Sequence, residues 1–204
     1  MTESGGLVLG LIVEGHGEAA AAPVLIRRIA LDNGFYSNLR FKTWRVGKSQ
    51  ILQSGELERT IEALTRQIGR RQPVLLLLDA DDDCPVDLAN ELRARCEARH
   101  ADVTVAVVAA RREYEAWFLA AAKSIAGRGG LLPALDRPSE PESIGGAKEW
   151  LSSHMTTGQC YSPTRHQTVF SAAIDLTQAR TARSFRKLEK EVARLIGWPV
   201  RHVD

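Results

Sequence analysis

Apolar runs alternate with segments of helical periodicity along the first half of the chain. Three runs, at residues 7–13, 74–78 and 103–109, are short and almost continuously apolar, as fully buried strands are. Residues 39–46 alternate well enough for a further strand. Strands that alternate with helices at this spacing predict an α/β fold, in which a mostly parallel, Rossmann-like sheet is covered by helices on both faces.

Local signals bound the predicted helices between these strands. The first helix is expected between Glu18 and Asp32, with Pro23 in or near its first turn. Ser54 is expected to cap the second helix, and Pro85 precedes the third. Predicted core positions are Val24, Leu25 and Ile29 in the first helix, Leu57, Ile61 and Leu64 in the second, and Leu88, Leu92 and Cys96 in the third.

The pattern changes after Ala110 and predicts a second region. We expect an α/β core over residues 1–110 and a mostly helical C-terminal extension over 111–204, packed on that core. The segments expected in the extension are a helix over 112–123, a loop over 127–146, a short helix over 147–153, an irregular polar stretch over 156–182 and a helix over 183–196.

Acidic residues follow two of the predicted strands. Glu14 and Glu18 come after the first strand, and Asp79, Asp81 and Asp83 come after the third. A carboxylate at the rim of an apolar core costs free energy and neighbouring carboxylates add repulsion, so a divalent cation would stabilise such groups. Because ligands bind beyond the carboxyl ends of parallel strands, both groups are expected at one site. The pattern predicts a Mg²⁺ or Mn²⁺ site suited to phosphate chemistry.

The Asp-rich segment has a predicted geometry. In extended backbone, Asp79 and Asp81 point to the same side and can reach one cation, whereas Asp82 is expected to face solvent. The alternative for residues 79–83 is an acidic turn ahead of Pro85.

Other candidate contacts each have a structural alternative. Gly15 and Gly17 would let the backbone approach a phosphate closely. His16 is a candidate phosphate contact or metal ligand, and otherwise an ordinary loop histidine. Trp117 and Phe118 can stack on bases, but an aromatic pair in an amphipathic helix more often belongs to the core.

Composition predicts a packed protein with unevenly placed charge. The 204 residues, 44% of them hydrophobic, suffice for one large domain or a domain with an appendage. The net charge of +2 says little, but residues 79–91 carry six acids and no base, and residues 39–49 carry four bases and no acid. A basic stretch near the C-terminus can follow a nucleic-acid backbone, or form a solvated helix face. Its residues are Arg180, Arg183, Arg186 and Lys187.

The cysteines and the N-terminus indicate a cytoplasmic location. Cys84, Cys96 and Cys160 are odd in number and unevenly spaced, which suits a reduced compartment better than a disulfide framework. The first apolar run follows no basic region, so no signal peptide is expected, and no run is long enough to span a bilayer.

The strand-end motifs resemble the Toprim domain. An apolar strand ended by Glu14-Gly15, a helix, and a later apolar strand ended by Asp79-x-Asp81 are similar to its core. Topoisomerases of types I and II, bacterial primases, small maturation ribonucleases and overcoming-lysogenization-defect (OLD) nucleases share that domain. The resemblance implies that Glu14 serves as acid/base and metal ligand, that Asp79 and Asp81 bind metal, and that Glu18 is the extra acid of the ribonuclease and OLD-type branches.

A longer series of motifs resembles an uncharacterised bacterial family, described only as a domain of unknown function with Toprim-like character. OLD-type nucleases use a further acid and a lysine, which by resemblance correspond to Glu115 and Lys148; a surface salt bridge is the alternative. A lysine there could neutralise charge on the scissile phosphate. Glu113 and Glu115 follow the fourth predicted strand and could reach the same edge of the sheet as Glu14 and Asp79. The motifs are Val13–Glu18, Leu78–Pro85, Glu115–Phe118, Gly146–Lys148 and Ser184–Phe185.

The resemblance implies a Mg²⁺- or Mn²⁺-dependent nuclease that cleaves DNA or RNA, in a bacterial defence or nucleic-acid-processing system. Many such nucleases act with an ABC/SMC-type ATPase. No Walker A motif occurs here, so if such coupling is needed a separate protein has to supply it; a Toprim module that is inactive without this partner is one alternative. The alternative is a nucleotide-sugar transferase or another metal-dependent phosphotransfer enzyme, in which apolar strands also end in Asp-Ala-Asp. No membrane partner is expected, and oligomeric assembly stays open.

Overall fold

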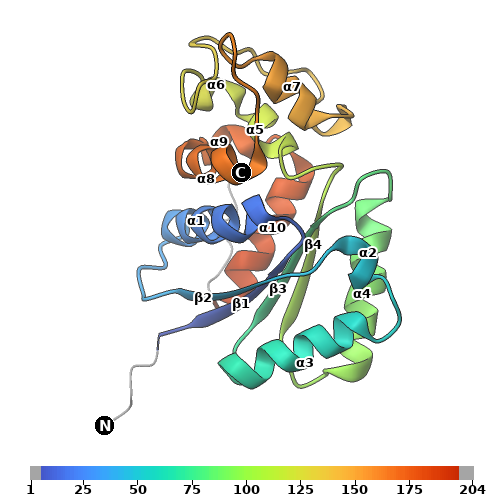
Figure 1. Cartoon of the computed structure of the whole chain (residues 1–204). Helices are drawn as coiled ribbons and strands as arrows, with labels where there is room; N and C mark the ends of the chain where they lie inside the picture. Colours follow the sequence, from blue (N-terminus) through green and yellow to red (C-terminus); the bar gives the residue numbers. More distant parts are fainter. Residues whose placement is uncertain (1–5, 198–204) are drawn as a thin grey trace.

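A four-stranded parallel sheet forms the centre of the computed structural model, which describes residues 6–197 (Figure 1). The strands lie in the order β2-β1-β3-β4. Their bounds are Val8–Val13 for β1, Arg40–Arg45 for β2, Val74–Asp79 for β3 and Val105–Ala110 for β4. The predicted α/β class, with a Rossmann-like sheet, is confirmed, and the sheet is parallel throughout.

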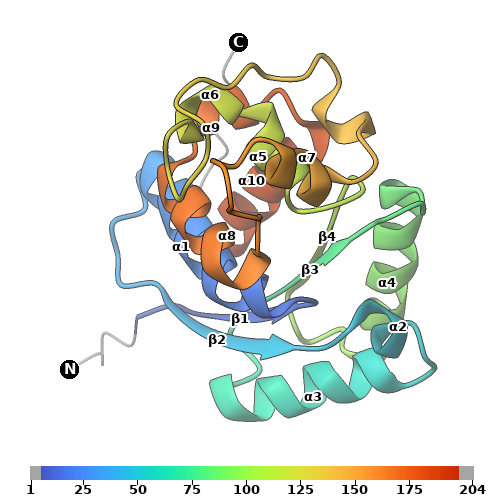
Figure 2. The ribbon, with the colours of Figure 1, turned by 45° about the horizontal axis from the view of Figure 1, so that its top comes forward.

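The two faces of the sheet are covered by different helices (Figures 1 and 2). Helices α1 (His16–Asp32) and α10 (Arg183–Leu195) cover one face, where Leu9 and Leu11 point. Helices α3 (Glu56–Ile68) and α4 (Pro85–Arg99) cover the other, where Ile12 points. Because β1 and β3 are buried on both faces, their sequences are almost continuously apolar.

The region after β4 completes one core with the sheet. Phe185, Leu188 and Val192 of α10 belong to the same hydrophobic cluster as Leu75 and Val108 of the sheet. The other elements of this region are α5 (Ala116–Ala120), α6 (Ala122–Ile125), a 3-10 turn (Pro141–Ser143), α7 (Ala147–Ser153), α8 (Pro163–Ala173) and α9 (Leu176–Ala179). The C-terminal residues thus supply part of the cover of the sheet; residues 1–5 and 198–204 of the two predicted regions lie outside the described residues.

Several predicted helix boundaries differ from the structure. Pro23 lies inside α1, which begins at His16, so its expected place in the first turn is wrong. Gly55, at φ 77°, caps α3 in place of Ser54. The helix predicted over 112–123 begins only at Ala116, because Arg112 adopts φ 61° and the chain turns there, and it is divided into two short helices at Ala121 (φ −117°, ψ 31°).

Three helices were not predicted, and two were predicted well. The short α2 (Lys48–Ile51) follows β2, and the stretch 156–182 contains α8 and α9. The predicted helices over 147–153 and 183–196 are confirmed by α7 and α10, the second of which ends one residue earlier than expected.

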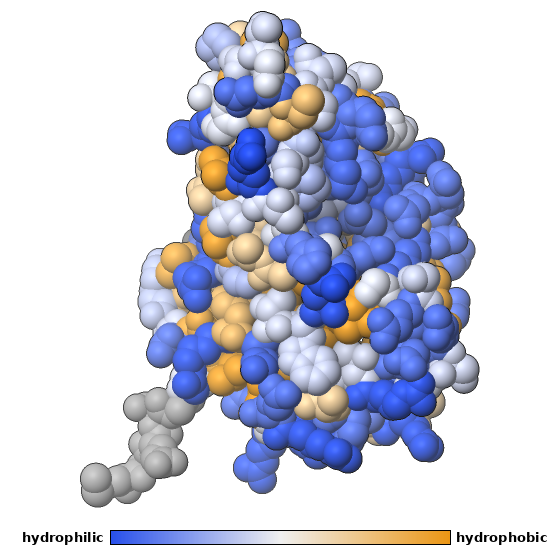
Figure 3. All heavy atoms as spheres, viewed as in Figure 1, coloured by the Kyte–Doolittle hydropathy of each residue, from blue (hydrophilic) through white to orange (hydrophobic). Residues whose placement is uncertain are grey.

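The surface is hydrophilic over α3 and α4, and hydrophobic atoms form small separate areas nearer α1 and β2 (Figure 3). Across residues 6–197, none of the helices combines the length and the apolar character needed to cross a bilayer.

Candidate functional site

Acidic side chains from three strand ends meet at the carboxyl edge of the sheet. Glu14 follows β1, Asp79 ends β3, and Glu113 and Glu115 follow β4. Since β1, β3 and β4 are neighbours in the sheet, parallel pairing brings these ends together. We call Glu14, Glu18, Asp79, Glu113, Glu115 and Lys148 the carboxyl-edge cluster.

Glu18 is held by the turn that begins α1. Its Oε2 accepts hydrogen bonds from the backbone amides of Gly15 (3.0 Å) and Glu14 (3.2 Å). A carboxylate at a helix N-terminus is favoured by the exposed amides there. Burial nevertheless raises the pKa of Glu18, and the charges of Glu115 and Glu14 raise it further.

Asp79 is buried at the end of the central strand. Its Oδ1 accepts the backbone amide of Tyr114 at 2.7 Å, which ties β3 to the loop after β4. Burial raises the pKa of Asp79 well above its usual range, and the charges of Glu18 and Glu115 add to this. The three carboxylates are therefore close enough to repel one another.

Glu115 is fully buried between the sheet and α8. Its Oε1 accepts hydrogen bonds from the Tyr161 hydroxyl (2.8 Å) and the Gln167 amide (2.9 Å). Its Oε2 is buried and has no hydrogen-bond partner among the described residues. Burial raises the pKa of Glu115, and the positive charge of Lys148 opposes that rise.

Lys148 is the cation that these carboxylates surround. Its Nζ lies 2.7 Å from Glu113, 3.7 Å from Glu115 and 3.8 Å from Asp79. Burial opposes its charge, but the carboxylates of Glu115, Glu113 and Asp79 outweigh burial and raise the pKa of Lys148. Lys148 therefore carries a full positive charge at neutral pH.

Glu113 fixes the position of Lys148 in the fold. Its Oε2 accepts the backbone amides of Ala147 (2.7 Å) and Lys148 (3.3 Å), the first two residues of α7. The helix begins there because Gly146 adopts φ 81°, in the left-handed region that favours glycine. One carboxylate thus holds both the start of α7 and the ammonium group of its second residue.

The carboxyl-edge cluster has more negative than positive charge. Five carboxylates accompany one ammonium group, and Glu14 Oε2, like Glu115 Oε2, is buried without a hydrogen-bond partner among the described residues. As the side chains lie, no three acidic, histidine or cysteine side chains within residues 6–197 enclose a single metal position. The orphaned carboxylate oxygens are nevertheless the donors that hard divalent cations prefer.

Asp81 and Asp83 lie apart from this cluster. Asp81 adopts φ 51°, so the extended geometry predicted for Asp79 and Asp81 is wrong. The nearly buried Lys48 of α2 binds Asp81 at 2.8 Å, Asp83 at 3.0 Å and the Ala80 carbonyl at 2.8 Å. Lys48 therefore holds the acidic loop of Asp81 and Asp83, whereas Lys148 pairs with the buried carboxylates. Asp82 faces solvent, as predicted, and contacts Arg112.

The other residues predicted to contact phosphate or nucleic acid differ in their exposure to solvent. His16 is exposed, and Gly15 is partly exposed beside Glu18. Gly17 is buried, and a Cβ there would lie 2.7 Å from the carbonyl of Pro163, so its glycine serves close packing of α1 against α8. Arg183 is exposed at the start of α10.

Sequence reasoning missed the residues that support Glu115. Tyr161 and Gln167 come from the stretch expected to be irregular, and Tyr114 bonds Ser171 of α8 at 2.8 Å. Trp117 and Phe118 are fully buried in the core rather than open to bases. Residues 161–171 are mostly polar, so no hydrophobic periodicity marks the helix. Its buried face contains His166, Gln167 and Ser171 beside Phe170.

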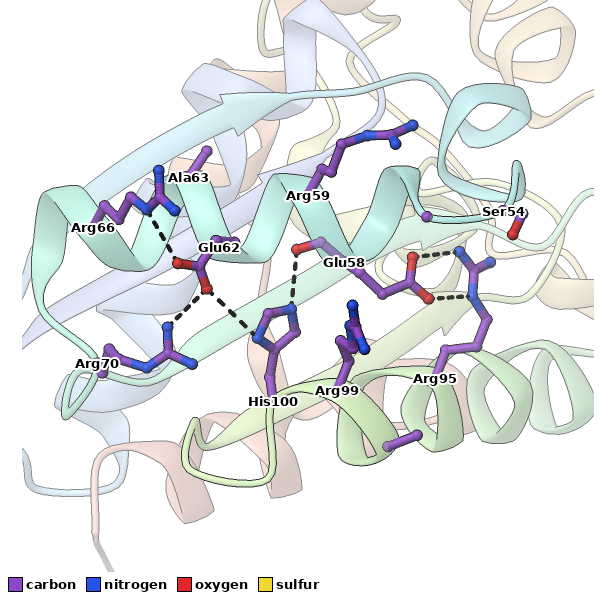
Figure 4. A pocket seen from close by; sticks show the side chains of 12 residues that line it. Ser54, Glu58, Arg59, Glu62, Ala63, Arg66, Arg70, Arg95, Arg99 and His100 are labelled. Atoms are coloured by element: carbon purple, nitrogen blue, oxygen red, sulfur yellow. Dashed lines mark hydrogen bonds and ion pairs between the residues drawn. The ribbon is translucent and has the colours of Figure 1, made fainter.

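A well-formed groove lies elsewhere, between α3 and α4 (Figure 4). We call it the arginine groove; its volume is about 970 Å³. Arg95 pairs with Glu58 at 2.9 Å, and Arg66 and Arg70 both pair with Glu62. Because four of its five arginines already pair with carboxylates, we do not place the site there.

One comparison with known proteins found a match. The family model described as a domain of unknown function, DUF4276, matches residues 13–193, so the chain belongs to this family. Comparisons with curated proteins and with solved structures returned no match.

Proposed function

We propose that this member of the DUF4276 family is a Mg²⁺- or Mn²⁺-dependent phosphodiester hydrolase of Toprim type that acts on nucleic acid. The observation that carries the proposal is the excess of buried carboxylates at the carboxyl edge of the sheet. Burial raises the pKa of Glu18, Asp79 and Glu115, and repulsion by neighbouring carboxylates raises the pKa of Glu18 and Asp79 further. Lys148 is the one ammonium group of the cluster. Strongly perturbed carboxylates at a strand edge are a recognised mark of functional sites.

A divalent cation fits the donor set. Glu14 and Glu115 each present a buried oxygen without a hydrogen-bond partner among the described residues, and Glu18 and Asp79 are adjacent carboxylates. These four residues would hold the ion. When bound, it would supply Lewis-acid polarisation of a phosphoryl oxygen and lower the pKa of a bound water. The acidic loop of Asp81 and Asp83 would contribute only if it left Lys48.

The chain's own residues supply the remaining chemistry. In hydrolysis a water oxygen bonds to phosphorus and the bond to the leaving sugar oxygen breaks. Glu14, on the loop after β1, takes the proton of the attacking water, and the leaving oxygen gains a proton from solvent. The Lys148 ammonium, partly exposed and fixed by Glu113, stabilises the charge that develops on the phosphoryl oxygens.

Cleavage of plasmid DNA and of RNA in the presence of Mg²⁺ or Mn²⁺ tests this proposal. Asp79→Ala and Glu14→Gln should each lose cleavage, and Glu62→Gln in the arginine groove is the matched control. Mn²⁺ should raise the Tm of the parent and not that of Asp79→Ala, which reads out binding without activity. Undiminished cleavage by both site variants would contradict the assignment.

A partner ATPase is part of the same proposal. The described residues form one compact α/β unit without a Walker A motif in the sequence, so any coupling to ATP hydrolysis has to come from a separate protein. Cleavage that appears only after a co-encoded ABC/SMC-type ATPase is added would support this arrangement, and full activity of the isolated chain would remove the need for it.

A further inference from the structure

A second groove runs along the open edge of β4, between α4 and α10. We call it the α10 groove; its volume is about 830 Å³. Val105, Val107 and Ala109 of β4 form its floor, since β4 is the last strand of the sheet and pairs only with β3 among the described strands. An uncovered strand edge of this kind is normally shielded by charged side chains or by a partner.

Basic side chains form a stripe along one wall of this groove. The residues of α10 that line it are Arg183, Lys187, Lys190 and Arg194. Their spacing of four, three and four residues places them on one helical face, and they span about 16 Å at 1.5 Å per residue. Arg93 of α4 and Arg111 after β4 add two further cations to the lining.

The cations of the α10 groove exceed its carboxylates. Six basic side chains accompany three acidic ones, Glu97, Glu142 and Glu191. Glu142 is already engaged, because it accepts the backbone amides of Arg183 (2.7 Å) and Ser184 (2.9 Å) at the start of α10. This groove therefore attracts anions.

Buried Glu191 orients two of the cations. Its carboxylate binds Lys187 at 2.5 Å and Arg194 at 2.7 Å, and Arg194 also bonds the Val105 carbonyl at 3.0 Å. The side chains of Arg183 and Lys190 have no ion-pair partner within the part of the chain that the structure describes. The stripe thus contains two fixed cations and two that remain available to a ligand.

One end of the α10 groove lies at the carboxyl edge of the sheet, where the carboxyl-edge cluster is also found. Arg111 directly follows β4 and lines the groove, and Glu113 comes two residues later. Cys84 and Pro85, also in the lining, follow the acidic loop after β3. An extended polyanion in the groove would therefore reach the same edge of the sheet as the buried carboxylates.

We propose that the α10 groove binds the phosphate backbone of a single nucleic-acid strand and leads it to the carboxyl-edge cluster. This inference rests on the proposed function and adds the path of the substrate. The cations recognise phosphates without reading sequence. An acidic polypeptide pairing with β4 would also meet positive charge. The groove ends at the same sheet edge as the proposed phosphodiester site, which favours nucleic acid.

Binding of labelled 20-nucleotide single-stranded DNA, single-stranded RNA and duplex DNA, measured by fluorescence anisotropy in EDTA, tests the path without cleavage. The double variant Arg183→Ala/Lys190→Ala should bind both single strands about tenfold more weakly. Its slope of log K against log salt should fall by ~1.4, because each phosphate that is no longer neutralised lowers the slope by about 0.7. The matched control is Arg66→Ala/Arg99→Ala, which removes two charges from the arginine groove and should bind as the parent does.

Each outcome separates this inference from the proposed function. Unchanged affinity and salt slope in the double variant would overturn the path, even if Asp79→Ala abolishes cleavage. Weaker binding in the double variant, with no cleavage by the parent either alone or with the partner ATPase, would support the path and contradict the nuclease. Displacement of the strands by polyglutamate at low concentration, with tighter binding of polyglutamate than of any oligonucleotide, would overturn the path in favour of a protein-binding edge.

Discussion

The carboxylates of the carboxyl-edge cluster and those of the arginine groove differ in how far their charge is balanced by basic side chains. In the arginine groove Glu58 and Glu62 each pair with at least one arginine, and Asp102 beside the groove pairs with Arg70. Hydrogen bonds from Arg95 lower the pKa of Glu58, and those from Arg70 lower the pKa of Asp102 to about 2. At the carboxyl edge, burial raises the pKa of Glu18, Asp79 and Glu115 instead, and repulsion adds to the rise for Glu18 and Asp79.

This difference supports the proposal that the carboxyl-edge cluster binds a ligand. Matched pairs at an exposed surface need nothing further and contribute little to stability. Buried carboxylates that repel one another lower stability unless another charge joins them, so a protein retains them where they act on something. We therefore expect chemistry at the unbalanced carboxyl-edge cluster rather than in the arginine groove.

The largest expected contrast is in activity. Glu115→Gln should lower metal-dependent cleavage by about 10²–10³-fold, the scale for removing one preorganised electrostatic interaction. Glutamine can still accept the Tyr161 hydroxyl, so the fold is kept while the charge is removed. Initial rates on a labelled oligonucleotide check this, with Glu62→Gln as control; equal rates in both variants would erase the contrast.

The next contrast is in stability and concerns Lys148. Lys148→Met should lower stability by ~2 kcal/mol at pH 8, less than for a fully buried pair because the ammonium is a third exposed. Glu113, Glu115 and Asp79 would be left without their counterion. The destabilisation should shrink toward pH 4 as the carboxyl groups take up protons. Urea unfolding at both pH values measures it, and a pH-independent effect would mean that weaker packing is the cause.

Removing a repelling carboxylate should have a smaller and opposite effect. The folded-state pKa of Asp79 is raised, so its charge costs no stability below the unfolded pKa of ~4 and costs most above the folded pKa. Asp79→Asn should therefore raise the Tm by ~2–4 °C at pH 8, or ~1 kcal/mol, and by little at pH 4. Calorimetry at both pH values tests this; a lower Tm at pH 8 would show that the carboxylate is already compensated.

The smallest effect is expected in the arginine groove. Arg66 is mostly exposed, and its contact with Glu62 at 3.0 Å is shared with Arg70. Arg66→Ala should therefore change the Tm by less than ~2 °C and leave cleavage unchanged. Thermal unfolding and cleavage of the same preparation check both parts, and a large drop in either would place functional weight in this groove.

The strands and the first two acids of the candidate site could be predicted from the sequence. Continuous apolar runs mark β1 and β3 because both faces of these strands are buried, and Glu14 and Asp79 stand where those runs stop. The position of Glu115 after the fourth strand indicated that it could reach this edge, whereas its role and the choice of Lys148 came from the family resemblance. In the structure Lys148, on α7, lies 3.8 Å from Asp79 and 3.7 Å from Glu115.

Two parts of the site could not be predicted from periodicity. The left-handed backbone at Asp81 turns that carboxylate to Lys48, and single-residue dihedral angles leave no periodic signal. Helix α8 buries Gln167 and Ser171 through hydrogen bonds, so the polar side chains that stabilise Glu115 and Tyr114 conceal the helix from a hydrophobic pattern.

A crystal of the protein soaked in Mn²⁺ tests the proposed metal site most directly, through the anomalous difference map. We predict a peak bounded by the carboxylates of Glu14, Glu18, Asp79 and Glu115, with Lys148 beside it. A peak at the Asp81 and Asp83 loop alone, or no peak within the carboxyl-edge cluster at millimolar Mn²⁺, would contradict that site.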